Sequence, residues 1–186
     1  MWSSQPAVAV NYLKNVTKQY EEHAAKNWTG ALRNPDAEPH AVLAALRYVE
    51  TRRIAGLESG LRELFTSSDP RLVRGDIVAA ALDALIATSL DHTETAAFLA
   101  LVASAEKPLP MSGAAEQALY RLVPEAHEAI LSELTQSHSP ARLRKLARLL
   151  MRMTSPTPPV PIGFWEEADE QDRREAVIRW RKRLAE

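Results

Sequence analysis

The sequence predicts an all-α protein, organised as a right-handed α-solenoid of about four helical hairpins with a C-terminal capping helix. Aromatic residues are only 6% of the chain, and alanine and leucine supply much of its apolar content, which favours close-packed helices over a β-sandwich. A short Leu-x-x-Ser phrase followed by proline also recurs at roughly 32 to 37 residues, a period typical of stacked helical hairpins.

The repeated phrase has three copies and a weaker fourth. In each clear copy a leucine, and a serine three residues later, are followed within four residues by a proline. The copies are Leu64–Ser67, Leu101–Ser104 and Leu134–Ser137, with Leu32–Pro35 as the weaker one. Each copy is expected to end one helix and to position the next.

The clearest hairpin lies between Leu64 and Ser89. Asp69 suits the N-cap of a helix, and Pro70 then occupies the first turn, where its missing N–H costs nothing. Apolar residues behind this turn recur at three- and four-residue spacing and predict a helix over 70–88. They are Val73, Ile77, Ala80, Ala81, Ala84 and Leu85.

The same spacing, together with caps and prolines, predicts the other helices. Asp91 with Glu94 forms a capping box, and Ser112 and Ser139 are further N-cap candidates. The expected helices cover 6–33, as one helix or as two that bend near Asn27, and 39–51, 52–66, 92–104, 112–122, 124–136 and 140–152. They pair into hairpins over approximately 6–50, 52–88, 92–122 and 124–152.

The chain is expected to form one domain with three parts. Residues 1–153 hold the repeat array. Residues 154–163 contain four closely spaced prolines and predict a polyproline strap along the array, or alternatively a ligand for a proline-recognising domain. Residues 164–186 begin with acidic and end with basic side chains, which matches a helix dipole, and are expected to cap the open end of the array.

The segment Asp69-Pro70-x-x-Val73-Arg74, with its small apolar residues behind it, resembles the second helix of a HEAT-type repeat. The third hairpin lacks this aspartate and Val-Arg pair, and the fourth has Ser139 and Leu143-Arg144 in their places. Ile162-Gly163-Phe164, the acidic stretch and Ala176 to Trp180 also resemble the ending of some bacterial HEAT-containing proteins. The resemblance implies a mostly non-catalytic fold that binds proteins, and sometimes nucleic acid, along its helical faces.

The composition of the chain excludes several classes of function. A net charge of −1 gives no global attraction to nucleic acid or to an anionic membrane. The absence of cysteine excludes disulfides, thiol catalysis and cysteine-based zinc sites. No apolar run is long enough to span a bilayer, and no signal peptide is visible, so we expect no membrane span and favour a cytoplasmic location.

Known catalytic and cofactor patterns do not occur in the sequence. His127-Glu128 opens like a zinc-protease motif, but Leu131 stands where its second histidine is required. Gly56 to Gly60 does not match the nucleophile elbow of a hydrolase, and no phosphate-binding glycine loop is found. We therefore expect no catalytic residue, no cofactor and no metal site.

The strongest local feature is basic. Arg144, Arg148 and Arg152 are spaced one helical turn apart and predict one stripe, which Arg181 and its basic neighbours could extend. This stripe predicts contact with an anion or a partner, or else an ordinary solvated face neutralised by residues 166–172. The tryptophans Trp28, Trp165 and Trp180 are candidates for packing at the chain ends or for contact hot spots.

These observations predict a non-enzymatic scaffold or accessory subunit with a protein partner. The alternative is a nucleic-acid-binding HEAT-like protein, similar to helical-repeat DNA glycosylases, which would use the basic face. A third possibility, a ligand-binding helical bundle, would require a large apolar pocket.

Overall fold

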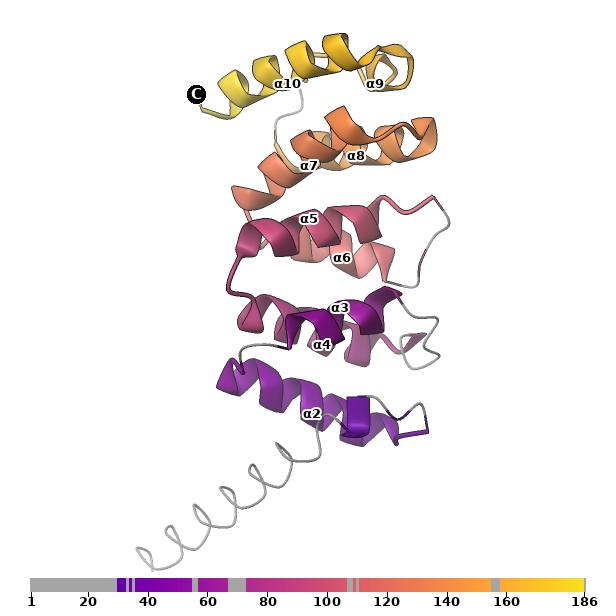
Figure 1. Cartoon of the computed structure of the whole chain (residues 1–186), viewed down its shortest axis with the longest axis vertical. Helices are drawn as coiled ribbons and strands as arrows, with labels where there is room; N and C mark the ends of the chain where they lie inside the picture. The colour runs from indigo at the N-terminus through magenta and orange to yellow at the C-terminus, as the bar shows by residue number, and fades with distance from the viewer. Residues whose placement is uncertain are drawn as a thin grey trace, which may run out of the picture. The chain divides into compact units, whose positions relative to one another are not determined.

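The computed structural model describes residues 30–32, 34, 36–54, 57–66, 73–106, 109, 111–154 and 158–185. Across these residues the regular structure is helical and contains no strand, so the all-α prediction is confirmed (Figure 1). The chain divides into two compact units. The first comprises Met1–Leu64 with Ser68–Thr88, and the second comprises Phe65–Ser67 with Ser89–Glu186.

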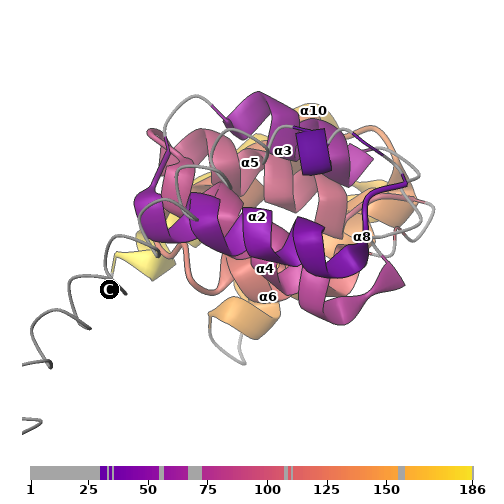
Figure 2. The ribbon, with the colours of Figure 1, turned by 90° about the horizontal axis from the view of Figure 1, so that it is seen from below.

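The first unit is built around two helices, α2 (Pro39–Arg52) and α4 (Gly75–Thr88), which pack against each other (Figure 2). Apolar residues recur every three or four positions along both helices and therefore form one buried face on each. These buried residues include Val42, Leu46 and Val49 of α2 and Ile77, Ala81 and Leu85 of α4. Helix α3 (Glu58–Thr66) lies between them in the chain.

Two predicted helices of this unit start later than expected. The helix predicted over 52–66 is interrupted at Arg53, whose φ of 48° is left-handed and ends α2, and α3 begins only at Glu58. The helix predicted over 70–88 begins at Gly75. Val73, expected on its buried face, precedes the helix and is 74% exposed. Asp69 and Pro70, and the expected helix 6–33 apart from residues 30–32, lie outside the described residues.

The second unit contains six described helices. They are α5 (His92–Ala103), α6 (Ser112–Leu119), α7 (Glu125–Gln136), α8 (Pro140–Met153), α9 (Phe164–Glu167) and α10 (Glu170–Leu184). Helix α5 packs against α6 and α7, α7 packs against α8 and α10, and α8 packs against α9. Within this unit the pairs α5/α6, α7/α8 and α9/α10 therefore follow one another as layers (Figure 1).

Side-chain bonds show how these helices are oriented relative to one another. Arg142, near the start of α8, bonds to Ser104 at the end of α5 and to Glu133 near the end of α7. Helices α5 and α7 therefore finish at the same edge of the unit. Arg181, near the end of α10, pairs with Glu128 in the first turn of α7, so α10 runs antiparallel to α7.

Of the four predicted caps, three lie in the described residues, and two of these are confirmed. The Asp91 side chain accepts from the N–H groups of Thr93 and Glu94, which lowers the pKa of its carboxyl group, and Ser139 accepts from the Arg142 N–H. Ser112 does not cap α6, because it lies inside the first turn. Its hydroxyl instead accepts from the Leu109 N–H and donates to the Val102 carbonyl, closing the loop after α5.

Two further boundaries differ from the prediction. The helix expected over 112–122 ends at Leu119, where the next N–H groups bond three residues back instead of four. The single helix expected over 164–186 is interrupted at Ala168, which is extended with ψ of 142° and separates α9 from α10. Asp169 then caps α10 by accepting from the Asp172 N–H at 2.8 Å.

The serines of the repeated phrase have a consistent environment, but the leucines do not. Ser104 and Ser137 are both buried at the ends of α5 and α7. Leu64 and Leu134 are buried, whereas Leu101 is 40% exposed on the solvent side of α5. Ser67 lies outside the described residues. The phrase therefore marks where these helices end more reliably than it marks the core.

Candidate functional site

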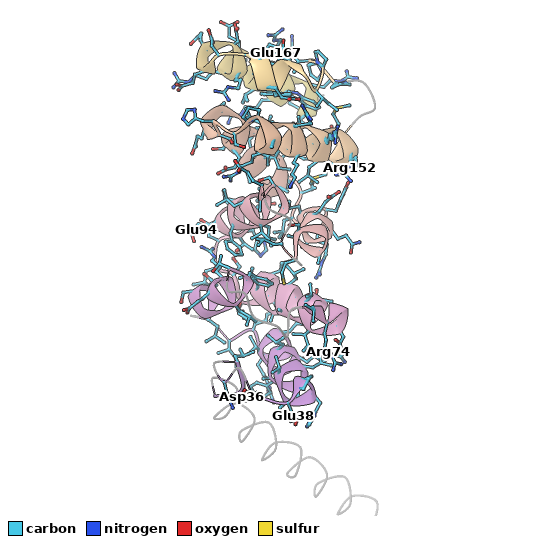
Figure 3. All side chains as sticks on the ribbon, turned by 90° about the vertical axis from the view of Figure 1, so that its right-hand side faces the viewer. Asp36, Glu38, Arg74, Glu94, Arg152 and Glu167 are labelled. Carbon is cyan, nitrogen blue, oxygen red and sulfur yellow. The ribbon has the colours of Figure 1, made fainter. Side chains whose placement is uncertain are left out.

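Helix α8 presents the predicted row of arginines. Its buried residues include Leu143, Leu146, Ala147 and Leu150 on one face. Arg144, Arg148 and Arg152 are spaced by four positions, so they lie on the opposite face and are exposed. Figure 3 labels Arg152 on this helix. We call these three residues the arginine row.

Both ends of the arginine row bind carboxylates from neighbouring helices. Arg144 makes a two-pronged contact with Glu166 of α9, in which its Nε donates to Oε1 at 2.7 Å and its Nη2 donates to Oε2. Arg152 Nη1 lies 2.6 Å from Oε1 of Glu116 on α6. The row therefore connects to the layers on both sides of α8.

The middle of the row has no such partner. Among the residues that the structure describes, Arg148 forms neither an ion pair nor a hydrogen bond. Its charge nevertheless acts on Glu166, whose pKa is lowered first by the hydrogen bond from Arg144 and further by the positive charges of Arg144 and Arg148. One carboxylate thus interacts with two guanidinium groups.

Two other basic residues of α8 have a different environment. Arg142 Nε donates to the Ser104 hydroxyl at 3.2 Å, and its Nη2 donates to Glu133 at 2.7 Å. Lys145 donates to the backbone carbonyl of Ala105 just after α5. Positive groups are favourable at this carbonyl-rich end of a helix. Both side chains therefore tie α8 to α5.

Arg181 does not extend the row along α8. It lies on α10 and donates to Glu128 of α7, with Nε and Nη2 at 3.0 and 2.9 Å from Oε2. Its contact joins α10 to α7, whereas the arginine row contacts α6 and α9.

The described tryptophans contribute to packing. Trp165 of α9 and Trp180 of α10 are each only 1% exposed. The Phe164 ring meets Trp165 edge-on, with ring centroids 5.6 Å apart, which is a favourable aromatic geometry. Trp28 lies outside the described residues.

Arg173 is a buried residue that belongs to none of the predicted motifs. Its Nη1 donates to the Ser137 carbonyl at the end of α7 at 2.7 Å, and its Nε is buried without a hydrogen-bond partner among the described residues. Its spacing to Ala176, Val177 and Trp180 places it on the apolar face of α10. This position in the pattern was the signal that it would be buried.

A hollow lined by polar side chains and a half-buried histidine are two further features of the second unit. A shallow hollow of about 410 Å³ is lined by Thr135, Gln136, His138, Glu170 and Arg174. His127 of α7 is half-buried and interacts with the backbone of Met153, and burial lowers its pKa. The described residues contain no group of three or more potential metal ligands.

Among the described helices, none combines the length and the apolar character that crossing a membrane requires. No protein-family model, curated protein or solved structure matches the chain.

Proposed function

We propose that this chain is a HEAT-like helical-repeat protein that binds another protein through the arginine row of α8 and the adjoining surface of α6. The observation that carries the proposal is the row itself. It exposes three guanidinium groups one turn apart, and carboxylates of the same chain are bound at both its ends. Guanidinium groups recognise carboxylates through paired, directional hydrogen bonds, and arginine is enriched in protein interfaces.

The connections between layers support the repeat architecture. The buried serine that ends α5 receives Arg142 from α8, and the buried serine that ends α7 receives Arg173 from α10. The first bond uses the serine hydroxyl and the second uses the backbone carbonyl. Successive layers are therefore joined at equivalent positions, as is expected when each repeat contacts its neighbours.

An exposed aromatic residue supports a protein partner. Tyr120 follows Glu116 by one turn and is 43% exposed at the end of α6. Glu116 pairs with Arg152, so Tyr120 extends the surface that includes the arginine row. Tyrosine and arginine together are typical of the residues that dominate binding energy in protein interfaces.

The test is affinity capture from the native lysate, with and without nuclease, using wild type and two charge-reversed variants. Arg148→Glu changes the middle of the row. Arg174→Glu makes the same charge change on α10, where Arg174 pairs with Glu170. We expect a protein partner that survives nuclease, is lost with Arg148→Glu and is retained with Arg174→Glu.

Two outcomes would contradict the proposal. Equal capture by Arg148→Glu and wild type would remove the arginine row from the binding surface. Recovery of nucleic acid alone, lost on nuclease treatment, would support the nucleic-acid-binding alternative.

A further inference from the structure

Helix α9 holds Glu166 in place by contacts that do not involve the arginine row. The buried Trp165 ring anchors this one-turn helix, and the Phe164 ring packs against it. The Ala168 N–H closes the turn on the Phe164 carbonyl at 2.9 Å. The position of the Glu166 backbone is therefore set by apolar packing and backbone bonds. This position places the Glu166 carboxylate next to Arg144 of α8.

The contact between Glu166 and Arg144 leaves the arginine side accessible. The Glu166 side chain is 18% exposed, whereas the Arg144 side chain is 51% exposed. Water competes for the exposed guanidinium of Arg144, which weakens the contribution of this ion pair to stability. A ligand that offers several carboxylates at once can therefore replace this single internal one.

The charges of the row leave room for such a ligand. Three arginines face two carboxylates, and Arg148 has no ion-pair partner among the residues the structure describes. The row extends over two helical turns, or about 12 Å at the helical rise per residue. That length suits a peptide with two or three carboxylates, whereas nucleic-acid binding usually needs several more cationic contacts.

We propose that Glu166 is an intramolecular competitor of the partner, and that the partner offers an acidic polypeptide segment. One carboxylate of that segment binds Arg148, and a second displaces Glu166 from Arg144. The chain already shows the required chemistry, because carboxylates from α6 and α9 bind this row. This inference rests on the proposed function and adds both the chemistry of the partner and a built-in control of its affinity.

The test is a titration in which the full chain is added to a short fluorescein-labelled poly-glutamate peptide at low salt. Binding is measured as the rise in the fluorescence anisotropy of the peptide. Glu166→Gln removes the competing charge but keeps the side-chain shape. We expect it to lower the Kd for the peptide by about three- to tenfold, because an internal competitor reduces the fraction of the binding-competent state. Near-ultraviolet circular dichroism, which reports the Trp165 environment, checks that α9 is retained.

The matched control is Glu175→Gln on α10. Glu175 is exposed and bonds to Gln171 on its own helix. This variant changes the net charge by the same amount, so it measures the general effect of removing one negative charge. We expect a change in Kd of less than about twofold, since the charge is outside the arginine row. Equal gains from Glu166→Gln and Glu175→Gln would overturn the competitor role.

Arg148→Gln separates the two proposals. It is expected to raise the Kd for the peptide by about fivefold or more, since it removes the cation that has no internal partner. If Arg148→Gln weakens binding and Glu166→Gln does not strengthen it, the row binds acidic segments and only the competitor role fails. If Arg148→Gln has no effect, the arginine row is not the binding surface. If Glu166→Gln binds a labelled single-stranded oligonucleotide more tightly than wild type does, but does not bind the peptide more tightly, an acidic polypeptide is the wrong choice of partner.

Discussion

Helix α8 carries two sets of basic residues with different roles, although they are neighbours in sequence. Arg142 and Lys145 reach the end of α5, where they donate to a serine hydroxyl and a backbone carbonyl. Arg144, Arg148 and Arg152 are exposed, and two of them pair with carboxylates on α9 and α6. The first set makes partly buried contacts with the neighbouring layer, whereas the second set is more exposed and remains accessible to a ligand.

The side of the helix on which each residue lies explains this difference. Arg142 and Lys145 lie on the flank of α8 that faces α5, where both side chains make contacts. Arg144 and Arg148 lie on the other side of the helix, because successive residues turn by about 100°. Basic residue content alone therefore does not identify a binding surface, because partly buried and exposed basic residues alternate along the same helix.

The largest effect is expected for Arg173, which extends the joining set to α10. Arg173→Ala removes a buried side chain and leaves the Ser137 carbonyl without its 2.7 Å donor. We expect the free energy of unfolding to fall by about 2–3 kcal/mol in urea titrations. Arg174→Ala is the control, because Arg174 is exposed and pairs only with Glu170 among the described residues, and it should cost less than about 0.5 kcal/mol. Equal effects of the two variants would show that burial does not decide the role of an arginine here.

A smaller difference is expected between Arg142 and Arg144. Arg142→Ala removes bonds to the buried Ser104 and the partly buried Glu133, and it should lower the free energy of unfolding by about 1–2 kcal/mol. Arg144→Ala removes a more exposed ion pair and should lower the free energy of unfolding by less than Arg142→Ala does. The measurement is the same urea titration at near-neutral pH. A larger loss with Arg144→Ala would reverse the assignment of the two sets.

His127 is a partly buried basic group, and its burial makes the stability of the fold depend on pH. Burial lowers the pKa of His127 from its usual 6.5, although its contact with the Met153 backbone and the Glu128 charge oppose this shift. The unfolded chain therefore takes up a proton first as the pH falls. The stability is fully present above pH 6.5 and decreases as the pH falls through the interval between the unfolded and folded pKa values.

The measurement compares urea unfolding at about pH 7.5 and about pH 5.5, on either side of the usual histidine pKa. Wild type should lose stability between these values, and His127→Gln should lose less. His138→Gln is the control, because His138 is exposed. If His127→Gln keeps the full pH dependence of wild type, another group causes it.

The sequence predicted the helical elements well because their apolar periodicity is local. Helices α7 and α8 agree with the predicted ranges to within one residue at either end. One error occurred where a side chain had two possible partners. The Ser112 hydroxyl could have capped α6, but it bonds to the Val102 carbonyl ten residues earlier, and local pattern does not decide between them.

The sequence predicted that the three arginines share one face, but it predicted only one of their two carboxylate partners. Four-residue spacing places Arg144, Arg148 and Arg152 on one face of any helix. The segment containing Glu166 was expected to neutralise this face, and Glu166 does pair with Arg144. The pairing of Arg152 with Glu116 and the bond from Arg173 to Ser137 depend on how layers pack, at a separation of 36 residues in each case. Such contacts are fixed by tertiary structure and leave no local signal.

The smallest effect on stability is expected for Arg148, and it tests the accessible set most directly. Arg148→Ala breaks no ion pair or hydrogen bond with the described part of the chain, and it removes a cation that lies one turn from both Arg144 and Arg152. Like charges at this spacing destabilise a helix by about 0.2–0.5 kcal/mol, and alanine has the best helix propensity. The loss of its attraction to Glu166 offsets part of this gain. We therefore expect the free energy of unfolding to stay unchanged or to rise by up to about 0.5 kcal/mol. The gain should shrink in urea titrations at high salt, where repulsion between exposed charges is screened. A loss of more than about 1 kcal/mol would mean that Arg148 joins layers as Arg142 does, because an exposed arginine without a structural contact cannot contribute that much.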